Sequence, residues 1–367
     1  NTAAMSAPDS SRVDDNESAD GVDITVDPPS TVGDPEQAPA EDIGHGSPAR
    51  AIGRWLGRGM LVLLVVIVAM ATWPVSTGGL GARSEPTSSY EESVELFNEL
   101  TADEPDFVFE PCQSQMMLHG QPTDVVVVLF HGLTNCPEQY LDFGTSLFDE
   151  GANVVILRAP GHGHANAGGD AIGSVSNAGG VDARELRDYA DDAIDIATGL
   201  GGEVRVTGLS MGGVIASWVA QFRDDVDRVV VVAPALNIPG TPSVATSAFL
   251  NLFSRVPNID LPGRSKLDHA YAGETSRGLA AMFTLARATQ DLTHRRGPAA
   301  SEVIVVINPD DDQVDPDEVQ GFATRWAKQD GRVSIEFLPA TGLPHDVIDE
   351  AQPAGDVDTV YPILFDL

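Results

Sequence analysis

Beyond residue 104, short apolar runs alternate with stretches of helical periodicity. The apolar runs have the length of strands and lie at 124–130, 153–158, 203–208, 226–232, 302–307 and 333–338. Helical stripes lie between them, at 137–150, 182–200 and 211–222. Uninterrupted apolar runs are typical of strands buried on both faces. Strands that alternate with helices predict an α/β fold, with a mostly parallel sheet and helices on both faces. Residues 106–111 and 115–118 are predicted to form a short hairpin before this sheet.

One long interval, residues 235–300, contains no strand-length run. A structureless loop of that length is implausible in a compact domain, so a small helical insertion is expected. Its apolar residues at helical spacing are Phe249, Leu250, Leu252, Phe253, Met282, Phe283 and Leu285. Two interpretations stay open and are compatible: these residues form a separate core of the insertion, or some of them form the apolar wall of a substrate pocket.

The N-terminal part of the chain has a different pattern. Residues 1–48 are rich in Asp, Glu, Pro, Ser and Gly and show no apolar period, which predicts a disordered acidic tail. An uncharged apolar run follows at 59–75, and arginines precede it. We expect one transmembrane anchor at 55–76, a stalk or linker at 77–103, and the folded domain at 104–367.

The charges around the apolar run predict its orientation. Arg50, Arg54 and Arg58 lie on the N-terminal side, so the N-terminus is expected in the cytoplasm and the folded domain outside a cell membrane. The alternative is a signal peptide whose cleavage at Ala69-Met70-Ala71 releases a secreted domain. A buried core helix fits less well, because the run is apolar on every face.

The charge of the chain excludes one class of partner. Asp and Glu number 55 against 21 Lys and Arg, a formal net charge of −34. Such a surface repels phosphate backbones, so no nucleic-acid partner is expected. It suits a salty medium, where screening weakens self-repulsion, although a merely acidic composition explains it equally well. Two cysteines are too few for a disulfide framework or a cysteine-rich zinc site.

The motif Gly208-Leu209-Ser210-Met211-Gly212 carries the clearest chemical signal. It follows a predicted strand and opens an apolar helix, which is the setting of a nucleophile elbow. Small residues must flank the serine because the turn is tight, and the helix N-terminus favours developing negative charge. Ser210 is therefore the candidate nucleophile. The alternative is a glycine-rich turn without catalytic function.

A second motif, His131-Gly132-Leu133, follows the Val-rich run at 124–130. A tetrahedral oxyanion needs preorganised N–H donors. The amide of Met211, directly after the nucleophile, is one candidate, and the amide of Leu133 is the other. His131 is interpreted as a structural histidine that holds this loop, in preference to a catalytic base.

The general base and its acid should follow the serine along the chain. Of the later histidines, His269 and His294 fall inside the insertion, whereas His345 lies just past the last predicted strand. A loop there reaches the carboxyl end of the sheet, so His345 is the candidate base. The acid should follow the strand at 302–307, where Asp310, Asp311 and Asp312 are adjacent. Sequence position alone does not separate these three.

Together these residues resemble the α/β-hydrolase superfamily, in its branch of monoacylglycerol lipases, carboxylesterases and serine aminopeptidases. The resemblance covers about residues 105–360. Its marks are His131-Gly132, Pro160-Gly161-His162-Gly163, Gly208 to Gly213, an Asp-x-x-Val pattern and His345. It implies a small helical cap at about 236–300, and a structural role for His162.

The resemblance also bears on the acid and on the substrate. In that branch the acid stands three residues before a valine, which implies Asp311 before Val314, with Asp312 as the second choice. The segment Leu-Thr-Asn-Cys-Pro after Gly132 departs from the Glu- and His-rich loop of the lipases, so the acyl-chain preference stays open. If the domain lies outside the cytoplasm, Cys112 and Cys136 are expected to form a disulfide that braces this loop. Two buried free thiols are the alternative.

We therefore expect a serine hydrolase that cleaves a small-molecule ester or lipid through an acyl-enzyme on Ser210, without a metal or an organic cofactor. One alternative is an aminopeptidase or amidase on the same fold. That activity needs carboxylates near the site to hold an amine, and Asp260, Asp268 and Glu274 are candidates. The other alternative is an inactive binding protein anchored in the membrane.

Overall fold

A computed structural model describes residues 48–263, 265 and 267–367, so the predicted acidic tail lies outside the described residues except for its last position. The compact domain extends from Gly57 to Leu367. Helix α1 comprises Pro48–Thr72. Its segment Trp55–Thr72 has a mean hydropathy of 2.1 and is not buried. Among the described residues, this is the one helix that is long and apolar enough to cross a membrane.

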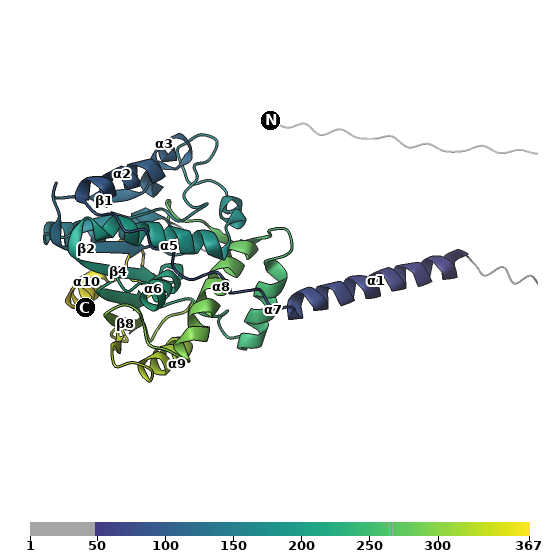
Figure 1. The fold of residues 1–367 in the computed structure, drawn as a ribbon. Coiled ribbons are helices and arrows are strands. Elements are labelled where there is room, and N and C mark those ends of the chain that lie inside the picture. Colours follow the sequence, from purple (N-terminus) through teal and green to yellow (C-terminus); the bar gives the residue numbers. More distant parts are fainter. Residues whose placement is uncertain (1–47, 264, 266) are drawn as a thin grey trace, which may run out of the picture. The chain divides into compact units, whose positions relative to one another are not determined.

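This domain contains a seven-stranded sheet with the order β1-β3-β2-β4-β5-β8-β9 (Figure 1). All neighbouring strands are parallel except β1 and β3, which confirms the prediction of a mostly parallel sheet. The strands are β1 (Gln115–Met117), β2 (Thr123–Phe130), β3 (Asn153–Ile156), β4 (Gly201–Leu209), β5 (Arg228–Val232), β8 (Glu302–Ile307) and β9 (Val333–Phe337).

The predicted hairpin at 106–111 and 115–118 is wrong. Residues Glu104–Phe107 form the short helix α3 and Glu110–Cys112 form the 3-10 turn η1, while β1 pairs with β3 instead. Pro105 and Pro111 explain the difference. Each occupies the first turn of its helix, where a missing N–H costs nothing, whereas a strand would lose a ladder hydrogen bond at the same position.

Helices cover both faces of the sheet because the strand residues alternate between two cores. Val126 and Val128 of β2 face one core, and Val127 and Leu129 face the other. The first core is covered by α5 (Ala183–Thr198), α6 (Met211–Phe222), α8 (Ser276–Thr293) and α9 (Pro316–Ala327). The second is covered by η2 (Pro137–Tyr140), α4 (Leu141–Asp149) and α10 (Val357–Asp366). The short turn η3 (Val175–Gly180) precedes α5.

The insertion between β5 and β8 is only partly a separate structure. It contains α7 (Ser243–Phe253), the two-stranded pair β6 (Asp260–Pro262) and β7 (Gly273–Thr275), and then α8. Helix α8 packs on α6 and α5, with α7 beside it (Figure 1). Met282, Phe283 and Leu285 therefore belong to the main core. The interpretation of these residues as a core private to the insertion is wrong.

Residues 77–103, predicted as a stalk, instead form part of the domain. Leu80 is buried, and its carbonyl accepts a hydrogen bond from the indole N–H of Trp218 at 2.6 Å. The amide of Glu85 donates to the Asp195 carboxylate at 2.9 Å. Helix α2 (Tyr90–Thr101) packs on α5 and places Phe97 in the main core. Long-range contacts of this kind leave no periodic signal in a segment rich in Gly and Ser.

Candidate active site

Ser210 occupies the sharp turn between β4 and α6. Its backbone lies at φ 61° and ψ −113°, a conformation that L-residues rarely adopt. The turn is held because the Ser210 amide donates to Val232 O at 3.1 Å, and Ser210 O accepts from Ala235 N at 3.2 Å. A side chain at Gly208 would overlap the backbone of Gly212. The small residues around Ser210 are therefore required by close backbone approach, as the motif predicts.

His345 and Asp311 lie against each other at the end of β8. His345 Nδ1 donates to Asp311 Oδ2 at 2.7 Å, and the side chains are 7% and 2% exposed. The other carboxylate oxygen of Asp311 accepts from the amide of Val314 at 2.8 Å. Of the three adjacent aspartates, Asp310 instead accepts from the amide of Gly342 at 2.8 Å. The pairing leaves Nε2 of His345 as the ring nitrogen that is not hydrogen-bonded to Asp311.

One buried side chain that the sequence analysis did not single out supports this histidine loop. The Asn308 amide group donates to the carbonyls of Leu343 at 3.2 Å and Pro344 at 2.8 Å. Asn308 is the first residue after β8, so it attaches the loop before His345 to the same strand end that carries Asp311. No spacing rule in the sequence marks this contact.

Ser210 and His345 line one cavity of about 450 Å³, at the carboxyl end of the parallel strands. Gly132 and Leu133 also line it. No hydrogen bond among the described residues occupies the backbone amide of Leu133 or that of Met211. The arrangement thus combines a hydroxyl, an imidazole backed by a carboxylate, and two free amides, which is the set that acyl transfer requires.

Two buried histidines hold the loop that carries Leu133. His131 Nδ1 donates to Gly132 O at 2.8 Å, and its Nε2 accepts from Ala159 N at 3.0 Å. Burial lowers the pKa of His131 to about 3, so its ring is neutral. The His162 ring lies with Nε2 2.8 Å from Leu133 O and Nδ1 3.0 Å from Pro160 O. Neither histidine lines the cavity.

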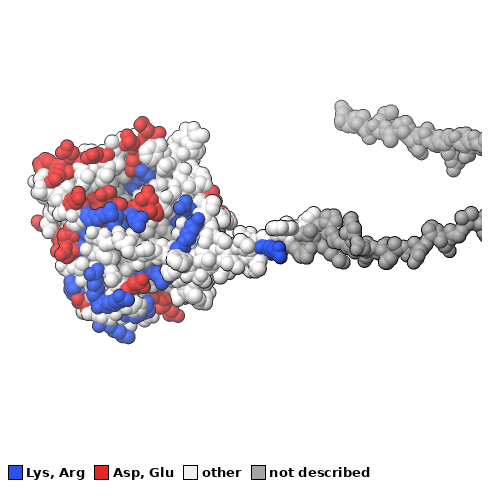
Figure 2. Space-filling model, turned by 45° about the vertical axis from the view of Figure 1, so that its right-hand side comes forward, with Lys and Arg blue, Asp and Glu red and all other residues white. Residues whose placement is uncertain are grey.

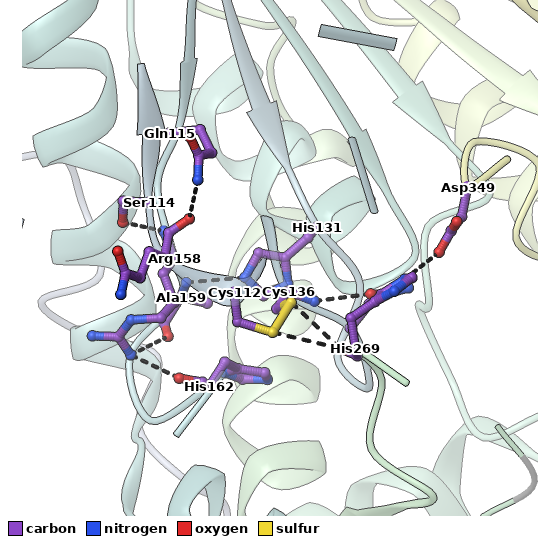
Figure 3. The surroundings of a disulfide bond; sticks show 12 residues. Cys112, Ser114, Gln115, His131, Cys136, Arg158, Ala159, His162, His269 and Asp349 are labelled. Carbon is purple, nitrogen blue, oxygen red and sulfur yellow. Dashed lines mark hydrogen bonds and ion pairs between the residues drawn. A yellow bond between two sulfur atoms is a disulfide. The ribbon is translucent and has the colours of Figure 1, made fainter. Parts of the chain in front are cut away.

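A disulfide joins Cys112 to Cys136 beside these histidines (Figure 3). Both sulfurs are buried, and the Cα atoms are 5.1 Å apart. The bond attaches the loop after β2 to η1, which precedes the sheet. Gly163 lies directly against it at φ 69°, and a side chain there would overlap Cys112. This close approach explains the second glycine of the Pro-Gly-His-Gly turn.

A polar network that the sequence did not reveal links the loop that carries Leu133 to the loop that carries His345. The side-chain amide of Gln139 donates to Asp346 Oδ2 at 2.7 Å, and its carbonyl accepts from Gly132 N at 2.7 Å. Asp346 directly follows His345, and its other oxygen accepts from the amides of Ile348 and Asp349. Burial raises the pKa of Asp346. Gln139 therefore fixes the Leu133 loop relative to the His345 loop.

A family model described as serine aminopeptidase, S33, matches residues 121–350. The chain belongs to this family of α/β-hydrolases. The match confirms the branch that the sequence motifs indicated, and Ser210, Asp311 and His345 lie within the matched range.

Solved structures agree with this fold. A structure from work on LipS and LipT, two metagenome-derived lipolytic enzymes, is 16% identical, with 71% of this chain and 98% of that chain covered and a TM-score of 0.54. A monoacylglycerol lipase from Paleococcus ferrophilus is 18% identical, with 69% and 96% covered and a TM-score of 0.50. At these identities the likeness concerns the fold alone. None of the curated proteins matches the sequence.

The insertion supplies one wall of the cavity in this hydrolase, but not through the helices that the sequence suggested. The wall residues are Gly263, Ser265, Leu267, Ala270, Tyr271 and Glu274, which lie between β6 and the end of β7. None of the apolar residues predicted as a pocket wall lines the cavity, so that interpretation is wrong. Periodicity identified buried helix faces, and these faces pack on the domain core.

A histidine–carboxylate pair fixes this wall segment. His269 Nε2 donates to Asp349 Oδ2 at 2.7 Å, on the loop that follows His345 (Figure 3). Burial alone would lower the pKa of His269, but Asp349 and the neighbouring carboxylates together raise it. The wall segment is thus attached to the histidine loop.

Within the described residues, no group of three or more His, Cys, Asp or Glu side chains could hold a metal ion.

Proposed function

We propose that this protein is a membrane-anchored serine hydrolase that cleaves carboxylic esters. One observation carries the proposal: Ser210 and His345 line the same cavity, and His345 is hydrogen-bonded to Asp311. Two fold neighbours, described as lipolytic enzymes and as a monoacylglycerol lipase, support an ester or lipid substrate.

In the proposed reaction, Ser210 Oγ attacks the ester carbonyl carbon while its proton moves to His345 Nε2. Asp311 stabilises the imidazolium that forms. The amides of Leu133 and Met211 donate to the oxyanion. The carbon–oxygen bond to the alcohol then breaks, the alcohol leaves with the proton from His345, and an acyl-enzyme remains. Water then attacks the acyl carbon while His345 takes its proton; the bond from that carbon to Ser210 Oγ breaks, His345 returns the proton to Oγ, and the acid leaves.

The proposed topology has the N-terminus in the cytoplasm, α1 in the membrane and the catalytic domain outside. The apolar segment Trp55–Thr72 supports the span. The disulfide between Cys112 and Cys136 supports an oxidising compartment for the domain, because such bonds are rare in the cytosol.

One observation favours a second candidate, an aminopeptidase or amidase. Glu274 lines the cavity, and no hydrogen bond or ion pair of its carboxylate is found among the described residues. Burial raises the pKa of Glu274, an effect that the nearby His345 partly offsets. A carboxylate in this position would bind a substrate amine. Asp260 and Asp268, the other candidates for this role, do not line the cavity.

The test uses full-length protein in detergent with p-nitrophenyl esters of graded acyl length and aminoacyl p-nitroanilides. We expect ester turnover, loss of that turnover in Ser210→Ala, and fluorophosphonate labelling of Ser210. Turnover that survives Ser210→Ala would refute the mechanism. Faster anilide hydrolysis, lost in Glu274→Gln but retained in the matched surface variant Glu99→Gln, would favour the aminopeptidase.

A further inference from the structure

The C-terminal end of α1 is bound to α7 by two side chains. The Asn251 amide group donates to Ala71 O at 3.0 Å and accepts from Val75 N at 2.9 Å. The Arg255 guanidinium donates to Met70 O at 3.3 Å and to Pro74 O at 3.2 Å. The bonds to Met70 O and Ala71 O satisfy carbonyls that the last turn of α1 leaves free, and the cation of Arg255, two residues past the end of α7, complements the helix dipole. Helix α7 therefore lies where α1 ends.

The chain segments that meet here contain no acidic residue, in a protein with 55 of them. The sequence has no Asp or Glu between Asp42 and Glu85, and none between Asp227 and Asp260. Figure 2 shows the consequence on the face drawn: the surface next to the end of α1 is mostly uncharged, and acidic side chains gather farther away. An acidic protein that keeps one surface free of carboxylates is suited to place that surface against a membrane.

The outer face of α7 is apolar as well. Val244, Ala248 and Leu252 repeat at a spacing of four residues; Val244 is 72% exposed, and Ala248 and Leu252 are partly exposed. The opposite face of α7 packs on the domain through Thr246 and Leu250, which are buried. Trp73, directly after α1, is 72% exposed. A partly exposed apolar helix face next to an exposed Trp is typical of segments that lie in the membrane interface.

We propose that α7 and Trp73 lie in the lipid headgroup region of the same bilayer that holds α1. The catalytic domain then rests on the membrane through this surface and is not suspended from a flexible stalk. The proposal rests on the proposed anchor, because the surface is continuous with α1 through Asn251 and Arg255. That continuity favours a lipid surface as the occupant over a second protein.

The test places single probes on the full chain. Cys112 and Cys136 are the only cysteines and are bonded to each other, so Val244→Cys and Leu100→Cys each introduce one reactive thiol. Leu100 is the matched control: it is apolar, 45% exposed, and lies on α2, away from α7 (Figure 1). Each variant is labelled with a nitrobenzoxadiazole fluorophore and inserted into phosphatidylcholine nanodiscs, in which both leaflets face solvent.

We expect iodide to quench the probe at position 244 several-fold less than the probe at 100. Phosphatidylcholine with a nitroxide near the headgroup should quench only the probe at 244. Ester hydrolysis equal to that of the unmodified protein verifies the fold of both variants. Equal iodide quenching in protein that co-elutes with nanodiscs would overturn this proposal and leave the anchor intact. Active protein that does not enter nanodiscs would overturn the anchor and this proposal, but not the esterase.

Discussion

Removal of the disulfide is the perturbation whose cost the structure allows us to estimate. Cys112 and Cys136 are 24 residues apart, so the chain-entropy model gives a stabilisation of about 3 kcal/mol. Both side chains are fully buried, and replacing them by alanine leaves small voids that cost on the order of 1 kcal/mol more. For a domain of this size each kcal/mol shifts Tm by about 2–4 °C. We therefore expect Cys112→Ala/Cys136→Ala to lower Tm by roughly 10 °C.

The assay is thermal unfolding of the full chain in detergent, followed by circular dichroism with and without a thiol reductant. Reduction should lower the Tm of the unmodified protein and leave that of the double variant unchanged. Because Cys136 follows the loop that carries Leu133, kcat for esters should also fall while the KM changes little. A Tm that reduction does not change, or two thiols that react with maleimide in the unreduced protein, would refute this account.

Three further predictions concern single side chains. Asp311→Asn should lower kcat for esters about 10⁴-fold without changing Tm greatly, because the amide cannot stabilise the His345 imidazolium; kinetics near wild-type rates would exclude Asp311 as the acid. Gln139→Leu should lower kcat roughly 10- to 100-fold, since Gly132 N and the Asp346 carboxylate both lose a buried partner; an unchanged kcat would contradict a positioning role for Gln139. Burial and neighbouring carboxylates raise the pKa of half-buried Asp192 to about 6, so its ionisation costs stability as the pH rises from about 4 through 6. Asp192→Asn should therefore raise the free energy of unfolding by about 1 kcal/mol at pH 8, after allowance for solvent screening, and change it little at pH 4. Equal Tm shifts at both pH values would contradict this.

The sheet and the tight turn at Ser210 were predictable because their signals are local. The valines of β2 are apolar on both sides of the strand, so the strand must be buried on both faces whichever strands it pairs with. A serine flanked closely by glycines indicates a tight turn, and only a few neighbouring residues are needed to recognise it. The choice of a hydrogen-bond partner for His345 needed more than local pattern. Three adjacent aspartates differ only in which carboxylate reaches His345, and the structure resolves this through the hydrogen bond at 2.7 Å.

Contacts between distant segments were not predictable in the same way. Residues 77–103 resemble a linker by composition, yet the Leu80 carbonyl and the amide of Glu85 find partners on α6 and α5. Likewise Gln139 and Asp346 belong to no motif, and they meet only because β2 and β9, the strands that precede them, end on the same side of the parallel sheet. Polar residues in loops are ordinarily solvated, so nothing in their sequence indicates that they are buried.

The insertion shows why the residues that contact the substrate were hard to predict from the sequence. Apolar periodicity reports that a helix face is buried but not what buries it, so Phe283 suggested a pocket wall while it packs on the domain core. The residues of the actual wall show no helical or strand period; they are Gly263, Ser265, Leu267, Ala270, Tyr271 and Glu274. Specificity should therefore depend on this segment, which the His269–Asp349 pair fixes to the histidine loop. Replacing the wall residues should change which ester or amide is preferred. Substitutions on the face of α8 that packs on the core, away from the pocket, should change only stability.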